Sequence, residues 1–208
     1  MARYPRELIA PALTACGLGV NALHTRHWLG SDQVHTGVGV TRLALVVLGI
    51  LHAGSDAKCA MAREAGAAHV INYATEDFEA RVKEITGGRG ADVIYDPVGG
   101  DIFDESVRCI AFDGAILSIG FTSGRLPVLP VNYALIKGFS VMGVRAGEYG
   151  RQFPEKGRAN NTAIWDLAAG GKVHPRVHEE YGLDGWRAAF DTLANRTVVG
   201  KTVVRPDL

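Results

Sequence analysis

The sequence predicts an α/β fold, a doubly wound parallel sheet with helices on both faces, and two observations support this fold class. Short β-rich runs alternate with helical stretches through the middle of the chain. The β-rich runs are apolar almost throughout, as expected of parallel strands that helices bury on both faces. The 208 residues form one predicted domain (1–208), because no repeat or low-complexity linker divides them.

The expected elements follow one another in order. Strands are predicted at residues 49–53, 67–72, 91–96, 114–119 and 139–144. Helices are predicted at residues 56–65, 75–85 and 101–110, and Thr75 is the expected N-cap of the second. A tail follows, with helices at residues 155–169 and 182–194, an extended segment at residues 173–177 and a last strand at residues 201–204.

The composition is typical of a soluble protein with a hydrophobic core. Hydrophobic residues make up 47% of the chain, charged residues 21%, and the formal net charge is zero. This balance gives no electrostatic support for binding nucleic acid or an anionic membrane. The apolar run at residues 43–51 is shorter than the roughly 20 residues that span a bilayer. The start of the chain does not resemble a signal peptide and the three cysteines are far apart, so we expect a cytoplasmic protein.

Candidate ligand-binding residues follow the strands, because an open parallel sheet binds ligands beyond the carboxyl ends of its strands. Ser55 and Lys58 follow the strand at residues 49–53, and their hydroxyl and ammonium groups suit the 2′-phosphate of NADP. Tyr73 follows the next strand and can flank the same phosphate. An acidic residue at this place would instead bind the ribose hydroxyls of NAD. Asp56 is close by, but it is equally well explained as a first-turn helix residue.

Two further loops permit a close approach of the backbone to a ligand. Pro97 and Val98, with the two glycines after them, follow the strand at residues 91–96. Gly120 and Phe121 follow the strand at residues 114–119. Ordinary turns have the same composition, so each loop alone is weak evidence. Their occurrence at successive strand ends favours a ligand site.

The histidines do not form a metal-binding pattern. His24 and His27 share the spacing of a helix face, and His174 and His178 lie in a segment that reads as extended. No carboxylate or cysteine completes either pair at metal-ligand spacing, so we predict no metal site. We interpret His52 as a structural residue. The sequence assigns no catalytic residue.

The order of five motifs resembles the medium-chain dehydrogenase/reductase superfamily, and within it the zinc-independent NADPH:quinone oxidoreductases. The motifs are Ala65-Gly-Ala, Val70-Ile-Asn-Tyr73, Asp92-Val-Ile-Tyr-Asp-Pro-Val-Gly-Gly100, Ile119-Gly-Phe121 and Gly200-Lys-Thr-Val-Val204. In this family's terms, residues 1–31 are a helical lead-in, residues 32–144 the Rossmann core, and residues 145–208 the C-terminal helices and strands.

The resemblance implies hydride transfer from NADPH to a quinone or another α,β-unsaturated carbonyl compound. By position, Lys58 and Tyr73, together with Ser55, would meet the 2′-phosphate. The same correspondence with the family implies that Pro97 and Val98 lie near the adenosine, and Gly120 and Phe121 near the nicotinamide ribose. The resemblance also implies a homodimer through the edge strand that begins at Ser140 and ends at Val144.

The sequence departs from the family pattern in two places. The first strand and the glycine-rich turn are short, because residues 33–40 hold a single Gly-x-Gly, Gly37 and Gly39, to present N–H groups to the pyrophosphate. The family's N-terminal GroES-like domain, which forms the other wall of the substrate cleft, is expected to be absent. Two hypotheses therefore stay open: an NADPH-dependent quinone or enone reductase, and a truncated, inactive nucleotide-binding or dimerisation module.

Overall fold

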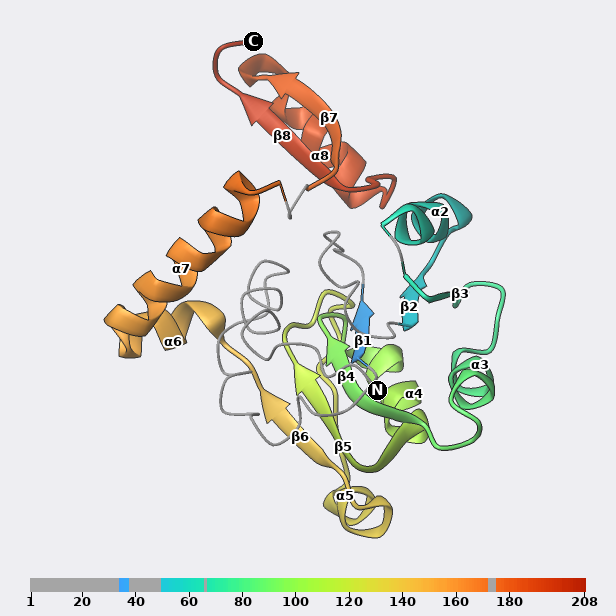
Figure 1. Cartoon of the computed structure of the whole chain (residues 1–208). Helices are drawn as coiled ribbons and strands as arrows, with labels where there is room; N and C mark the ends of the chain where they lie inside the picture. Colours follow the sequence, from blue (N-terminus) through green and yellow to red (C-terminus); the bar gives the residue numbers. More distant parts are fainter. Residues whose placement is uncertain (1–33, 38–49, 66, 172–174) are drawn as a thin grey trace.

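A six-stranded parallel sheet forms the centre of the molecule (Figure 1). The computed structural model describes residues 34–37, 50–65, 67–171 and 175–208. The strands lie in the order β3-β2-β1-β4-β5-β6, and every neighbouring pair is parallel. Their bounds are Val34–Gly37 (β1), Ile50–Ala53 (β2), His69–Asn72 (β3), Ala91–Asp96 (β4), Ile110–Ser118 (β5) and Ser140–Gly143 (β6). The predicted doubly wound α/β fold is confirmed.

Helices connect and flank these strands. Their bounds are Asp56–Glu64 (α2), Phe78–Ile85 (α3), Gly100–Cys109 (α4), Val131–Lys137 (α5), Ala146–Gln152 (α6), Pro154–Ala169 (α7) and Trp186–Ala194 (α8). The sequence did not predict α5 and α6, each of which has seven residues. So short a helix spans about two turns, too few for a clear apolar periodicity.

Three local predictions were wrong. Thr75 does not cap α3: its backbone N–H bonds to Asn72 O in a turn, and the Asp77 carboxylate accepts from Ala80 N instead (2.9 Å). β5 begins at Ile110 rather than at residue 114, because the β4–β5 register shifts and the strand already pairs with β4 at Ile110. The tail segment that begins at Gly182 is not one helix, since the 3₁₀ turn Leu183–Gly185 precedes α8.

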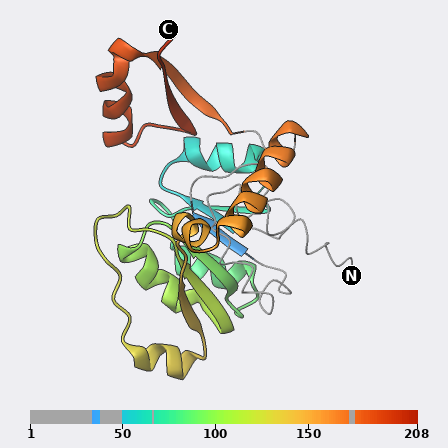
Figure 2. The same ribbon diagram turned by 90° about the vertical axis from the view of Figure 1, so that its left-hand side faces the viewer.

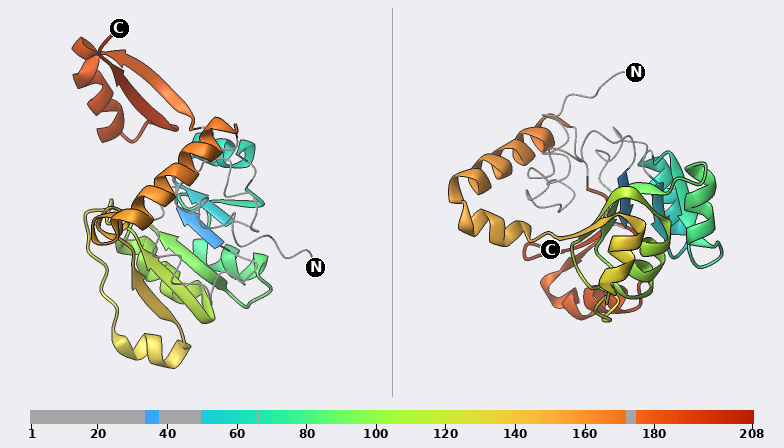
Figure 3. Two further views of the ribbon diagram at one scale, coloured as in Figure 1. Left: turned by 60° about the vertical axis from the view of Figure 1, so that its left-hand side comes forward. Right: turned by 90° about the horizontal axis from the view of Figure 1, so that it is seen from below.

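The hydrophobic core lies mainly between the sheet and two helices. Phe78 of α3 and Phe103 of α4 pack with Ile71, Ile94 and Ile116 of the strands in one buried cluster. A second cluster gathers Val93 of β4, Ala115 and Leu117 of β5, and Val144, which follows β6. Successive strand side chains point to opposite faces, so the two clusters lie on opposite faces of the sheet. α6 and α7 lie on the opposite side of the molecule from α3 (Figure 3).

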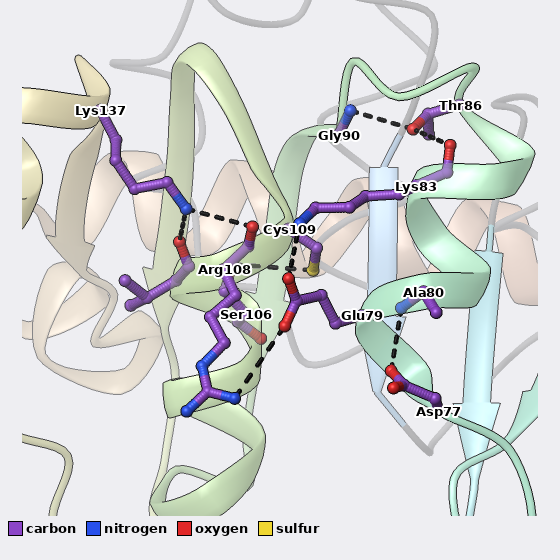
Figure 4. Close-up of polar contacts among 11 residues, drawn as sticks. Asp77, Glu79, Ala80, Lys83, Thr86, Gly90, Ser106, Arg108, Cys109 and Lys137 are labelled. Carbon is purple, nitrogen blue, oxygen red and sulfur yellow. Dashed lines mark hydrogen bonds and ion pairs between the residues drawn. The ribbon is translucent and has the colours of Figure 1, made fainter.

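Polar contacts join α3, α4 and α5 at the amino end of β5 (Figure 4). Glu79 of α3 pairs with Lys83 on the same helix (2.5 Å) and with Arg108 of α4 (4.0 Å). Lys137 of α5 donates from Nζ to the backbone carbonyls of Val107 and Arg108 at the end of α4. A cation at this end of a helix satisfies orphan carbonyls and complements the helix dipole. These contacts anchor the helices at the end of the sheet opposite to the carboxyl ends of the strands.

The last part of the chain forms a small unit of its own, beside α2 (Figures 1 and 2). Here β7 (Val177–Gly182) and β8 (Lys201–Arg205) form a separate parallel pair, and α8 connects them. The predicted strand at residues 201–204 is confirmed, whereas the extended segment predicted at residues 173–177 partly lies outside the described residues. In the described portion of the chain, no helix is long and apolar enough to cross a membrane.

Candidate functional site

The carboxyl ends of the strands meet at one edge of the sheet, and the predicted loops follow them there. β1 lies between β2 and β4, and the chain proceeds from β1 to β2 on one side and from β4 to β5 on the other. This reversal of strand order is a topological switch point, where open α/β sheets hold their ligands. The predicted residues divide into two groups, one on each side of this point.

Ser55, Lys58 and Tyr73 come together at the carboxyl ends of β2 and β3. The Ser55 hydroxyl caps α2 by accepting a hydrogen bond from Lys58 N (3.4 Å). Tyr73 is 40% exposed and lies across Gly54, where a Cβ would stand 2.6 Å from the tyrosine hydroxyl oxygen. A side chain at position 54 would therefore displace the Tyr73 ring. The group lies at the N-terminus of α2, which favours an anion.

Arg196 joins this group from the C-terminal unit, and sequence reasoning missed it. Lys58 Nζ donates to the backbone carbonyl of Arg196 (2.9 Å), in the turn that follows α8. Arg196 has a left-handed backbone (φ 58°), and its guanidinium makes no hydrogen bond or ion pair with a described residue. The Arg196 backbone thus lies against the Lys58 ammonium group. No sequence signal reveals this, because 138 residues separate Lys58 from Arg196.

Asp56, the alternative ribose-binding residue, makes a contact inside the protein. It lies in the first turn of α2, and its Oδ1 accepts a hydrogen bond from Asn72 Nδ2 (2.8 Å). Asn72 is buried at the end of β3, and its backbone N–H donates to Glu76 Oε1 (2.8 Å). Asp56 therefore joins the start of α2 to the end of β3. A carboxylate is also favoured in the first turn of a helix.

His52 lies beneath the surface of this side of the site, between Tyr73 and the hydrophobic core. Its ring is buried and packs against Tyr73 (5.7 Å between ring centroids) and Phe78 (4.8 Å). Burial lowers the pKa of His52 from 6.5 to about 4, so the imidazole is neutral at pH 7. Within the described ranges, its Nδ1 atom has no hydrogen-bond partner. This placement agrees with the structural interpretation of His52.

Pro97, Val98, Gly120 and Phe121 form the other side. The backbone carbonyl of Pro97 accepts from Thr122 N (3.2 Å), and a Cβ on Gly120 would lie 3.2 Å from the same oxygen. The Phe121 ring is exposed at this surface. Burial raises the pKa of Asp96, which precedes Pro97, and hydrogen bonds from Gly99 N and Val98 N partly offset that shift.

Some predicted residues cannot be compared with the structure. Gly37 ends β1 and pairs with His52 of β2, whereas Gly39 lies outside the described residues. The same holds for His24, His27 and His174. In the part of the chain that the structure describes, no three His, Cys, Asp or Glu residues are grouped so that they could hold a metal ion.

Comparison with known proteins places the chain among dehydrogenases. The family described as "Zinc-binding dehydrogenase" matches residues 46–160. The "Quinone oxidoreductase-like protein 2 homolog" of Nematostella vectensis is 34% identical over 171 residues, which are 81% of this chain and 47% of that protein. A "Quinone oxidoreductase" of Salmonella typhimurium is 36% identical over 159 residues, 74% of this chain and 47% of that protein. The chain spans about half the length of these curated relatives.

Solved structures show the same relationship. A quinone oxidoreductase of Escherichia coli, in a crystal structure with NADPH, superimposes with a TM-score of 0.78 at 28% identity. The match covers 95% of this chain and 63% of that chain. A quinone oxidoreductase of Pseudomonas syringae superimposes with a TM-score of 0.76 at 25% identity, over 99% of this chain and 67% of that chain.

Proposed function

This chain belongs to the medium-chain dehydrogenase/reductase superfamily, within its quinone oxidoreductase group, and from that premise we propose that it binds NADPH for hydride transfer to a quinone or α,β-unsaturated carbonyl. One observation carries the cofactor choice. Lys58, whose ammonium contacts the Arg196 backbone, and Tyr73, which lies over Gly54, follow the carboxyl ends of β2 and β3, while the nearby Asp56 bonds to Asn72. Cations and hydroxyl groups suit a phosphate, and a free carboxylate suits unphosphorylated ribose.

The nicotinamide ring would supply the hydride when the cofactor is bound, and the protein would supply binding and orientation. Lys58 and Arg196 would hold the 2′-phosphate, and Tyr73 and Ser55 would border it. Pro97 and Val98 would face the adenosine half, and Gly120 and Phe121 the nicotinamide ribose. Gly37 and Gly39 would approach the pyrophosphate through their backbone.

NADPH binding is tested by fluorescence titration of the purified chain with NADPH and with NADH. We expect tighter binding of NADPH, and a roughly 10- to 100-fold loss in Lys58→Glu, the range for losing a charged hydrogen bond. Lys156→Glu, which changes an exposed lysine at the start of α7, is the matched control and should bind normally. No binding at millimolar NADPH, or equal loss in both variants, would overturn the proposal.

Turnover separates the enzyme from the inactive module. An assay with NADPH and a simple quinone should show oxidation of NADPH above background, and Lys58→Glu should abolish it. The alternative is a chain that binds the nucleotide without transferring its hydride. Tight NADPH binding without turnover would support that alternative, a nucleotide-binding or dimerisation module.

We also propose that two copies pair in a homodimer through the segment from Ser140 to Val144, which comprises β6 and the residue after it. β6 is an edge strand of the sheet, and Val141 on it is 41% exposed. The adjoining α5 exposes Val131, Leu135 (82%) and Ile136. An unpaired apolar edge beside an apolar helix surface favours strand pairing with a second copy.

Light scattering after size-exclusion chromatography tests the dimer. Val141→Lys should shift the chain from dimer to monomer, because a charge on the edge opposes pairing. Val177→Lys, which changes an exposed valine on β7, should leave the dimer intact. A monomeric wild-type chain at micromolar concentration would refute the pairing.

We propose the cytoplasm as the compartment of this protein. In the described segments Cys59 and Cys109 are free and buried, which suits a reducing environment.

A further inference from the structure

The turn after β4 and the loop after β5 are held together at the candidate site. Pro97 O accepts from Thr122 N (3.2 Å), and Val98 O accepts from Ser123 N (3.0 Å). The Phe121 ring occupies the space beside Gly99, where a Cβ would lie 3.2 Å from the ring carbon Cδ1. The two loops therefore form one continuous surface, and the shape of the first determines the shape of the second.

The Asp96 side chain shapes the first of these loops. Its Oδ1 accepts hydrogen bonds from the backbone N–H groups of Val98 and Gly99, both at 2.8 Å. Gly99 and Gly100 have positive φ values of 68° and 56°, a backbone conformation that glycine adopts with little strain. Because α4 starts at Gly100, the carboxylate also lies at the N-terminus of a helix, where the dipole favours a negative charge.

Packing alone does not explain an acidic residue at this position. Asp96 is 1% exposed, and its second oxygen, Oδ2, is buried without a hydrogen-bond partner among the residues described. An apolar side chain would fill this space without the cost of burying an unpaired oxygen. What the carboxylate provides, and an apolar residue cannot, is the pair of hydrogen bonds to the turn.

We propose that Asp96 is a positioning residue, which holds the turn at residues 97–100 and, through it, the loop at residues 119–123 in the shape that binds the cofactor. It acts through the backbone and does not touch the cofactor, because its side chain is enclosed by the protein. This inference rests on the proposed function, since it assigns a role within the same NADPH site.

Three variants of the full chain test this role by hydrogen–deuterium exchange and NADPH titration. In Asp96→Ala both hydrogen bonds are lost, so amides in residues 119–124 should exchange roughly tenfold faster, and the Kd for NADPH should rise roughly tenfold. Asp96→Asn keeps an oxygen acceptor and should restore most of both properties. Asp92→Ala removes an acidic residue at the other end of β4 and should change neither.

Each outcome decides a separate question. Unchanged exchange in residues 119–124 of Asp96→Ala, or equal damage in Asp96→Ala and Asp96→Asn, would overturn the positioning role. If Asp96→Ala does not fold, Asp96→Ser, with one shorter acceptor, should exchange faster than Asp96→Asn, and the reverse order would refute the role. If the wild type does not bind NADPH, the proposed function fails, while the exchange measurement still tests the link between the loops.

Discussion

The central sheet and the C-terminal unit both contain parallel strands joined by helices, but they differ in how many of their side chains are buried. The sheet encloses fully buried side chains such as Ile50, Ile71 and Ile94. Of the C-terminal residues that the structure describes, 175–208, only Ala189 is buried, and Trp186 and Phe190 of α8 are exposed. A two-stranded sheet with one helix has too little apolar surface to form a core of its own.

Among the described residues, two polar contacts between the regions fall on α2. Lys58 near its start donates to Arg196 O, and Glu64 at its end pairs with Arg176 (3.1 Å). Exposed polar contacts of this kind contribute little stability. The sheet is therefore held by burial of apolar side chains, whereas directional polar contacts attach the C-terminal unit, and one of these contacts lies in the candidate site.

The largest expected effect is a difference in stability loss between alanine variants of two phenylalanines, one in each region. Phe78→Ala removes a buried ring of the sheet core and should lower the free energy of unfolding by about 3–5 kcal/mol. Phe190→Ala, on the exposed face of α8, should cost less than about 1 kcal/mol. Urea denaturation followed by circular dichroism measures both. Equal losses of unfolding free energy in the two variants would contradict this prediction, because they would show that α8 is buried in solution.

The next effect concerns pH and also lies in the sheet. His52 has a pKa of about 4 when folded and 6.5 when unfolded, so between these values the unfolded state binds more protons. Stability should therefore fall by roughly 3 kcal/mol as the pH drops from 7 to 4. His52→Leu should remove this part of the pH dependence, as measured by urea denaturation at each pH.

The control for this prediction is His178→Gln, on an exposed residue of β7. It should retain the wild-type pH dependence, because it leaves His52 and its surroundings unchanged. The raised pKa of Asp96 makes the free energy of unfolding rise as the pH falls through the acid range, opposite to the effect of His52. This contribution is the same in the wild type, His52→Leu and His178→Gln. If His52→Leu and the wild type lost stability in parallel, His52 would not be the group responsible.

The smallest effect sharpens the account of how the C-terminal unit is attached. Arg176→Gln removes the pair with Glu64 and should change the global free energy of unfolding by less than about 1 kcal/mol. Hydrogen exchange should nevertheless become faster in β7 and stay unchanged in β4. Glu180→Gln, which removes a pair inside the C-terminal unit, is the matched control. Faster exchange in β4 of Arg176→Gln would show that the two regions unfold together.

Predictions from the sequence succeeded where neighbours along the chain determine the structure. The strand at residues 91–96 was predicted with the bounds of β4, because a run centred on Val93, Ile94 and Tyr95 lies between a glycine turn and a proline. The start of β5 was missed, since Ile110 joins the sheet by pairing with Ala91 and follows α4 directly. That pairing depends on register between strands, which local pattern does not encode.

The sequence by itself determined the fold class, the family and the strand ends at which ligand-binding residues gather. These follow from short-range patterns, because apolar runs and turn residues act over a few positions. Only the tertiary structure brought Arg196 beside Lys58, laid Tyr73 over Gly54 and joined the Asp96 turn to the loop at residues 119–123. Each of these contacts joins segments that are distant in sequence, so the path of the chain through the sheet decides it.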